Sequence, residues 1–252
     1  MKDEERLICN RILDIANSSY YRNIPVTTDF MDLYSQSLFQ TIIKELPPVK
    51  WTMVGGYELS ERKLIIFYPE YITEPDLEEF YSVIRIKPTD KRFSEELTHR
   101  DFLGSIMGLG INRSKLGDII IEDKEAIIFC STGISDYLIE NLTKIRHTLV
   151  SCELIHNKAI DFCPRYDEIT GSIASLRLDS VISLGFGKSR SHLITYIEEG
   201  KIFVNGRIIT SNAYSIKDGD IISVRGLGKI RFINSISTTK KGRIMVKLHK
   251  YI

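Results

Sequence analysis

Cysteine is scarce in this sequence, long apolar runs are missing, and no frame typical of a nucleotide or metal site is present. The four cysteines are widely separated and form no CxxC pair, which argues against a zinc site and is typical of reduced core thiols in a cytosolic protein. No apolar run approaches the roughly 20 residues that span a bilayer. The charged N-terminus does not resemble the apolar core of a signal peptide. We therefore expect no metal, no cofactor, no small-molecule substrate and no membrane partner.

The net charge of +1 conceals two regions of opposite sign. Residues 176–252 hold 14 Lys and Arg against 5 Asp and Glu, a formal charge of +9. The preceding residues hold 20 basic and 28 acidic side chains, a formal charge of −8. A basic module beside an acidic body is expected when contacts with nucleic acid are concentrated at one end of a chain.

The stretch from Ser175 to Phe232 contains the most specific pattern in the chain. Two short amphipathic helices are joined by a Gly-rich elbow that ends in Lys188-Ser189-Arg190-Ser191. A hairpin follows at Asn205-Gly206, and another strand begins at Asp218-Gly219. This order of elements resembles the small RNA-binding fold first known from bacterial ribosomal protein S-four.

The elbow predicts a contact with the RNA backbone. Ser189 is a good N-cap for the second helix, and a helix start presents unpaired N–H groups and a positive dipole that favour a phosphate. Lys188 and Arg190 add full positive charge, so the elbow is expected to carry the main RNA contacts. Other basic residues are expected to support it, although the sequence does not show which way they face: Arg177, Lys201, Lys217, Arg225 and Lys229.

We expect an α+β fold in three parts. Hydrophobic spacing predicts helices over 3–16 and 28–46 and strands over 49–57 and 63–71, which form an N-terminal α/β cap. The order strand, helix, strand, strand, helix, strand over 82–155 predicts a ferredoxin-like (βαββαβ) middle domain. The expected bounds are 1–75 for the cap, 76–160 for the middle domain, 161–175 for a linker and 176–252 for the RNA-binding module of the S-four type, which ends in a basic hairpin.

The middle domain has the strand order of RNA-recognition domains but not their surface. Its third strand, Ala126 to Cys130, lacks the aromatic pattern on which bases stack. Whether this domain binds RNA is therefore left open. Gly104 and Gly108 lie four residues apart on one face of its first helix, which predicts close packing against a neighbour.

Three motifs that resemble catalytic sites have plainer interpretations. Gly55-Gly56 lacks the G-x-x-x-x-G-K-[ST] frame of a phosphate loop and reads as a tight turn. Asp179 lies in a triplet similar to the catalytic motif of pseudouridine synthases, but it opens a helix, where an acid matches the dipole. His99 has no partnered nucleophile nearby in the sequence. We expect no catalytic residue.

Longer segments resemble the YlmH family of bacterial RNA-binding proteins. They are Gly55-Gly56-Tyr57-Glu58 with Glu61-Arg62-Lys63, the run Phe67-Tyr68-Pro69-Glu70-Tyr71, and Leu97 to Ile119. With the C-terminal module, the resemblance covers nearly the whole chain. It implies a cytosolic factor of ribosome-associated quality control. Such a factor binds large subunits that carry a stranded peptidyl-tRNA and holds the tRNA while C-terminal tails are added.

The leading hypothesis is thus a non-enzymatic, cytoplasmic RNA-binding factor. Its expected partners are RNA (ribosomal RNA and tRNA) and the large ribosomal subunit. One alternative is an enzyme that modifies ribosomal RNA and uses the C-terminal module for delivery. Another is a cell-division adaptor, a role linked to genes of the family.

Overall fold

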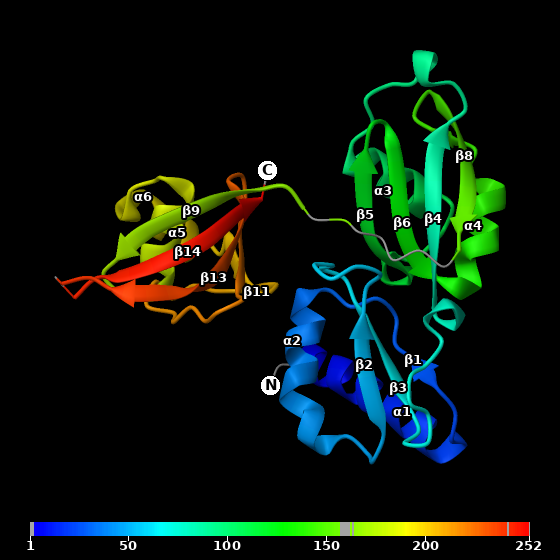
Figure 1. Ribbon diagram of the computed structural model, residues 1–252, viewed down its shortest axis with the longest axis horizontal. Coiled ribbons are helices and arrows are strands. Elements are labelled where there is room, and N and C mark those ends of the chain that lie inside the picture. The colour runs from blue at the N-terminus through cyan, green and yellow to red at the C-terminus, as the bar shows by residue number, and fades with distance from the viewer. Residues whose placement is uncertain (1–2, 157–161, 163, 241, 252) are drawn as a thin grey trace. The chain divides into compact units, whose positions relative to one another are not determined.

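The computed structural model describes residues 3–156, 162, 164–240 and 242–251. It has the α+β class that the sequence predicts, and it consists of two compact units, Met1–Phe162 and Cys163–Ile252 (Figure 1). Each unit has a hydrophobic core of its own. Among the described residues, no helix combines the length and the apolar character needed to cross a membrane.

The N-terminal half of the first unit is a three-stranded antiparallel sheet with two helices on one face. Its central strand is buried along its whole length, because Ile65 and Phe67 pack against the helices while Leu64 and Ile66 point the other way. The strand order is β1-β3-β2, and β2 and β3 form the predicted hairpin. The elements are α1 (Asp3–Arg22), β1 (Val26–Thr27), α2 (Leu33–Ile42), β2 (Lys50–Val54) and β3 (Leu64–Tyr68).

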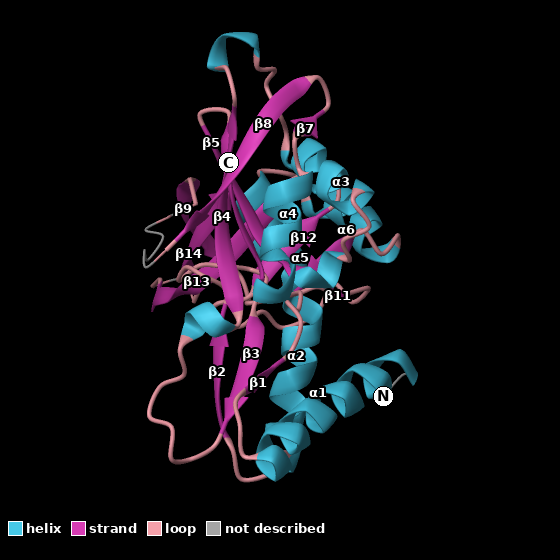
Figure 2. Cartoon of the chain, turned by 90° about the vertical axis from the view of Figure 1, so that its right-hand side faces the viewer, coloured by secondary structure: helices cyan, strands magenta, loops and turns pink. Residues whose placement is uncertain are grey.

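The second half is the predicted ferredoxin-like fold. The strands lie in the order β5-β6-β4-β8-β7, all antiparallel, with both helices packed on one face (Figures 1 and 2). The second helix ends at Asn141, and the short edge strand β7 follows it before β8. The elements are β4 (Tyr81–Pro88), α3 (His99–Gly108), β5 (Leu116–Glu122), β6 (Glu125–Ser131), α4 (Ser135–Asn141), β7 (Lys144–Ile145) and β8 (Thr148–Ile155).

Two helices begin at side-chain caps, and for α2 this start is later than the predicted residue 28. Residues 28–31 run beside β3 through backbone hydrogen bonds, and α2 begins only after its N-cap Asp32. Helix α3 begins after Thr98, which forms a capping box with Asp101. In both places the backbone N–H groups of the first turn find side-chain acceptors, and these caps set where the helix starts.

The two halves share an apolar core, which is why they form one unit. The face of the middle sheet opposite α3 and α4 presents Ile120 and Phe129, and these pack against Leu64 and Ile66 of β3. The position after residue 75, where a domain boundary is expected from the sequence, therefore does not separate independent bodies.

The second unit is a six-stranded antiparallel sheet with α5 and α6 on one face (Figure 1). The strand order is β11-β10-β12-β13-β14-β9. The two helices, the hairpin at Asn205-Gly206 and the final hairpin β13–β14 are as predicted. The elements are β9 (Tyr166–Ile173), α5 (Leu178–Phe186), α6 (Arg190–Glu198), β10 (Ile202–Val204), β11 (Arg207–Ile208), β12 (Ile221–Val224), β13 (Gly228–Thr238) and β14 (Ile244–Tyr251).

The predicted linker 161–175 is wrong over most of its length. Residues Tyr166–Ile173 form strand β9, which pairs with β14 along all eight residues. Ile173 is buried in the core and Ile169 packs against it. Gly171 lets α5 approach, since a Cβ there would lie 2.5 Å from a methyl of Leu184. The strand is polar on its other face, and that made it resemble a linker.

The cysteines match the prediction of reduced core thiols wherever they are described. Cys9 and Cys130 are buried and Cys152 is half-buried, and all three are free. Burial raises the pKa of Cys130 to about 12 and that of Cys152 to about 11, so both thiols stay protonated at neutral pH. Cys163 lies outside the described residues.

The close packing predicted for Gly104 and Gly108 is wrong. Both are exposed, and a Cβ built on either would meet nothing within 4 Å. One glycine of this unit that does permit a close approach is Gly56, in the turn after β2. It has a φ of +92°, and a Cβ there would overlap the ring of Phe129.

These two glycines should respond to alanine in opposite directions. Gly104→Ala should raise the free energy of unfolding by about 0.5–1 kcal/mol, since glycine is a poor residue in a helix interior. Gly56→Ala should lower it by about 1–3 kcal/mol through overpacking and a strained φ. Urea denaturation of the full chain measures both. A stabilised Gly56→Ala variant would contradict the packing around Phe129.

The role of β9 predicts where the second unit can be cut. A fragment covering 163–252 should melt in one cooperative transition, whereas 175–252 lacks β9 and the buried Ile173. Losing a buried isoleucine costs about 2–5 kcal/mol, which lowers the Tm of a domain of this size by at least about 8 °C. Thermal melts followed by circular dichroism compare the two fragments. Equal melting temperatures would show that β9 is dispensable.

Candidate RNA interface

The elbow between α5 and α6 has the geometry that the sequence predicts. Gly187 ends α5 in the left-handed conformation (φ 62°), and the Ser183 hydroxyl donates to the Lys188 carbonyl oxygen (2.7 Å). Ser189 is the N-cap of α6, and its hydroxyl accepts from the His192 N–H (3.3 Å). One serine thus fixes the helix start, and the first-turn N–H groups that it does not reach point outward.

The elbow also concentrates positive charge. Lys188 and Arg190 are exposed, and within the described part of the chain neither has an ion-pair partner. The first turn of α6 contains no acid, while Glu198 and Glu199 lie at the opposite end of the helix. The helix dipole and two full charges therefore act at one exposed place, as anion binding requires.

Two of the expected supporting charges are held in ion pairs on their own element or turn. Arg177 precedes α5, and its Nε lies 3.1 Å from Asp179. Lys201 follows α6; its ammonium lies 2.5 Å from Glu199 and above the ring of Tyr196. Hydrogen bonding to Glu199 raises the pKa of Lys201. Part of the charge of each cation is already balanced within the protein.

The three remaining supporting charges lie in two places, the loop beside the start of α5 and the far face of the sheet. Lys217 is exposed in a loop beside the start of α5. The loop is held there by the Ile216 N–H, which donates to the Leu176 carbonyl oxygen (2.8 Å). Arg225 and Lys229 flank the turn between β12 and β13. They contact rings on the sheet face opposite the helices, so the structure divides the predicted charges between two faces.

Asp179 has the structural role expected of an acid at a helix start. It is 5% exposed, accepts from the Ser180 N–H (2.9 Å) and pairs with Arg177. These contacts occupy the carboxylate, which leaves it poorly placed as a nucleophile. His99 is exposed at the start of α3.

The open face of the middle sheet lacks the features of an RNA-recognition surface. Phe129 is the aromatic residue of β6, and it is fully buried against the N-terminal half. Farther along the same face, Arg85 and Lys87 both pair with Glu153 (3.3 and 2.7 Å). Hydrogen bonding to Lys87 is the main cause of the lowered pKa of Glu153. The face is thus partly covered and partly neutralised by its own charges.

Asp118 of β5 organises the turn between β2 and β3. Its carboxylate accepts from the Tyr57 hydroxyl (2.8 Å) and from the N–H groups of Glu61 and Arg62 (2.7 and 3.0 Å). The Arg62 guanidinium in turn donates to the Leu116 carbonyl oxygen (2.8 Å). The Gly55–Lys63 and Leu97–Ile119 segments, far apart in the sequence, are therefore bound to each other.

Arg62 and Arg113 lie together in this region and are both half-buried. Burial lowers the pKa of each, and the neighbouring Arg62 charge lowers that of Arg113 further, to about 10. Arg113 donates to the carbonyl oxygens of Leu116 and Gly117 (2.7 and 3.1 Å). Both guanidiniums thus cross-link backbone segments.

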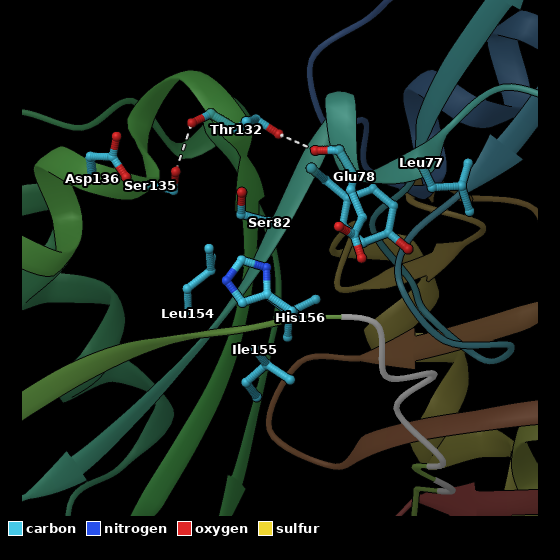
Figure 3. A pocket seen from close by; sticks show the side chains of 11 residues that line it. Leu77, Glu78, Ser82, Thr132, Ser135, Asp136, Leu154, Ile155 and His156 are labelled. Carbon is cyan, nitrogen blue, oxygen red and sulfur yellow. Dashed lines mark hydrogen bonds between the residues drawn. The ribbon is translucent and has the colours of Figure 1, made fainter.

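A cavity of about 290 Å³ lies at the end of the middle sheet, but it has no catalytic arrangement (Figure 3). His156 projects into it between Asp136 of α4 and Glu78. The hydrogen bonds drawn there, Ser135 to the Thr132 carbonyl oxygen and Thr132 to that of Glu78, hold the walls together. Within the described ranges, no three His, Cys, Asp or Glu residues are placed to hold a metal ion.

Comparison with known proteins identifies the family. The model called "Putative RNA-binding domain in YlmH" matches residues 75–159, and the S4 domain model matches 176–222. Ribosome-associated protein quality control protein P2 of Bacillus subtilis is 30% identical over 99% of this chain and 96% of its own length. The chain belongs to the YlmH family. The resemblance seen in the sequence is confirmed.

Other relatives match parts of this YlmH-family chain. Small ribosomal subunit protein uS4 of Acidithiobacillus ferrooxidans is 39% identical over 25% of this chain and 32% of its own, and that of Pseudomonas putida is 32% identical over 27% and 35%. The solved structure of cell division protein ylmH from Streptococcus pneumoniae has a TM-score of 0.52 at 21% identity. It covers 62% of this chain and 93% of that one, and it supports the fold.

Sequence reasoning missed the aromatic residues that accompany the charges of the YlmH-family module. Phe203 lies under Arg225 (5.2 Å), Tyr251 under Lys229 (5.8 Å), and Tyr166 lies in the segment taken as a linker. The signal was present as alternation in β14, where Ile244, Val246 and Leu248 face the core and the intervening residues include a ring at Tyr251.

The Asp118 network predicts a large effect of one substitution. Asp118→Ala leaves the Glu61 and Arg62 N–H groups without their acceptor and should lower the free energy of unfolding by about 2–4 kcal/mol. Tyr57→Phe removes one of the three bonds and should cost only about 1 kcal/mol. Urea denaturation of both full-length variants tests this. Equal, small effects would mean that Asp118 does not organise the turn.

Proposed function

We propose that this protein is a non-enzymatic RNA-binding factor that acts on ribosomes in the cytoplasm. More specifically, it binds large ribosomal subunits that carry a stranded peptidyl-tRNA, in ribosome-associated quality control. The elbow, Lys188 to Ser191, contacts the phosphates of ribosomal RNA and tRNA. The supporting charges on the helix side, Arg177, Lys201 and Lys217, raise the local positive potential.

The observation that carries this proposal is the start of α6. A capped helix of nine residues begins at an exposed site between Lys188 and Arg190, on a region with a formal charge of +9. Such a site recognises phosphate without reading bases. The relatives add to it, because one is named as a ribosome-associated quality control protein and others are ribosomal proteins that share the module.

The elbow is tested by reversing its two charges. Lys188→Glu/Arg190→Glu should fold as the parent does, since acids are tolerated at a helix start, yet leave the large-subunit fraction in density gradients. The control Lys44→Glu/Lys144→Glu makes the same charge change at exposed positions of the first unit and should co-sediment like the parent. On purified RNA, the slope of log Kd against the logarithm of the salt concentration should be smaller by about 2 for the elbow variant than for the parent.

Two further measurements separate this proposal from its rivals. A folded elbow variant that co-sediments with peptidyl-tRNA-bearing large subunits as the parent does would exclude the elbow as the contact. Loss of a methyl group or pseudouridine from ribosomal RNA in a deletion strain would indicate a modifying enzyme instead. If the parent protein binds neither RNA nor ribosomes, the RNA-binding function itself is wrong, and a cell-division adaptor becomes the better hypothesis.

A further inference from the structure

The second unit presents a line of side chains across the sheet face opposite α5 and α6. Cross-strand pairs join Ile208 to Phe203, Phe203 to Ser223, and Ser223 to Lys229. Lys229 lies over the ring of Tyr251, which pairs with Tyr166 across β14 and β9. We call this line the sheet row; it takes one residue from each of the six strands: Ile208, Phe203, Ser223, Lys229, Tyr251 and Tyr166.

The sheet row is open to solvent and belongs to no core. Ile208 is 54% and Tyr166 37% exposed, while Phe203 and Tyr251 are half-buried. None of the six residues is among those packed between the sheet and its helices. The rings alternate with cations, because Arg225 lies 5.2 Å from the Phe203 ring centre and Lys229 lies 5.8 Å from that of Tyr251.

The charge around the sheet row is positive. Arg231 and Lys247 lie on the same face in the next rows of the sheet, in register with His249 and Thr170. The acid described on this face is Glu168, which pairs with Lys247 (2.6 Å). Burial lowers the pKa of His249, and the Lys247 and Arg231 charges lower it further against the opposing effect of Glu168. The ring of His249 stacks on Tyr166, with centroids 3.7 Å apart.

Rings that are partly accessible to solvent and lie among cations fit unpaired nucleotides better than a duplex. In a duplex the bases are stacked on each other and only edges and phosphates are accessible, whereas single-stranded bases stack on aromatic side chains while the cations meet the phosphates. The spacing is suitable, since neighbouring strands lie about 4.8 Å apart and the rings of Phe203 and Tyr251 are three strands apart, roughly 14 Å. That span accommodates about two nucleotides in an extended strand.

We propose that the sheet row is a second RNA contact of this chain, which binds unpaired nucleotides through the rings of Phe203, Tyr251 and Tyr166. The inference rests on the proposed RNA-binding function and adds a class of ligand to it. The elbow holds phosphates by charge on the helix side, and the sheet row holds bases by stacking on the opposite face. Arg225 and Lys229 belong to this second contact.

The test uses the full chain and two RNA probes. One is an unstructured oligouridine of roughly 12 nucleotides, within the site size of comparable binding surfaces, and the other is a hairpin with a continuous stem. Tyr166→Leu/Phe203→Leu keeps apolar bulk but removes two rings. It should lower the affinity for oligouridine about tenfold or more, leave that for the hairpin within about twofold, and leave the salt dependence unchanged.

Control variants separate stacking from folding. Tyr166→Phe/Phe203→Tyr retains both rings and should bind oligouridine like the parent. Tyr21→Leu removes an exposed ring from the first unit and should have no effect. If the leucine variant melts below the parent, Lys229→Gln with Arg225→Gln provides a second test, since it removes two charges of the sheet face and leaves all three rings in place.

The outcomes distinguish this inference from the proposed function. If the parent binds the hairpin but not oligouridine, or if the leucine variant keeps the parent affinity for oligouridine, the sheet row is not an RNA contact and the elbow proposal stands. If the leucine variant leaves ribosomes while its affinity for both probes is unchanged, the face binds protein and the inference is wrong. If the parent binds neither probe nor ribosomes, the proposed function has failed as well.

Discussion

The burial of Phe129 between two sheets determines how the first unit is built. The residue comes from a central strand of the middle sheet, and the N-terminal β-sheet covers it with Leu64 and Ile66. Gly56 lies against the ring of Phe129 and Gly117 lies against its Cβ. Because neither glycine has a side chain, the two sheets approach closely there. The middle sheet cannot expose this ring without separating the two halves, and the halves therefore act as one body.

Because this face of the middle sheet is covered, the accessible surfaces suited to RNA lie on the second unit. In ferredoxin-like RNA-recognition domains, aromatic side chains on the open sheet face stack on bases. Here the corresponding face packs against the chain's own N-terminal half, and on the rest of the face Glu153 balances part of the charge of Arg85 and Lys87. The C-terminal unit has the opposite character, with exposed cations at the elbow and exposed or half-buried rings on the sheet. The basic C-terminal part of the sequence is thus also the part of the structure whose cations remain accessible.

The sequence predicted most of the elements because their signals are local. The N-cap Ser189, the left-handed Gly187 and the hairpin at Asn205-Gly206 depend on a few adjacent residues, and all are found as expected. The ferredoxin-like order was also predictable, since each strand and helix has its own period. The family followed from the long distinctive segments. The predictions that were wrong concerned features that depend on contacts between distant residues.

Two examples show why distant contacts were not predictable. Strand β9 is an edge strand with one polar face, and only its pairing with β14 distinguishes it from a linker. Gly104 has the spacing of a close helix contact, but among the described residues none lies within 4 Å of a Cβ placed there. The candidate site was divided for the same reason, since the faces of Arg225 and Lys229 follow from strand register. The register depends on how two strands pair, and the sequence of one strand alone does not determine that pairing.

The pairing of β9 with β14 also affects the order in which the second unit folds and unfolds. Ser172 and Arg243, joined by hydrogen bonds at one end of this ladder, are 71 residues apart, so the loop between them must close before the ladder can form. The helices and the strands β10 to β13 are connected by much shorter segments. Local contacts form early and distant ones late. The outer strand is therefore expected to join the folded module last and to detach first, which would expose the edge of β14 while the elbow stays intact.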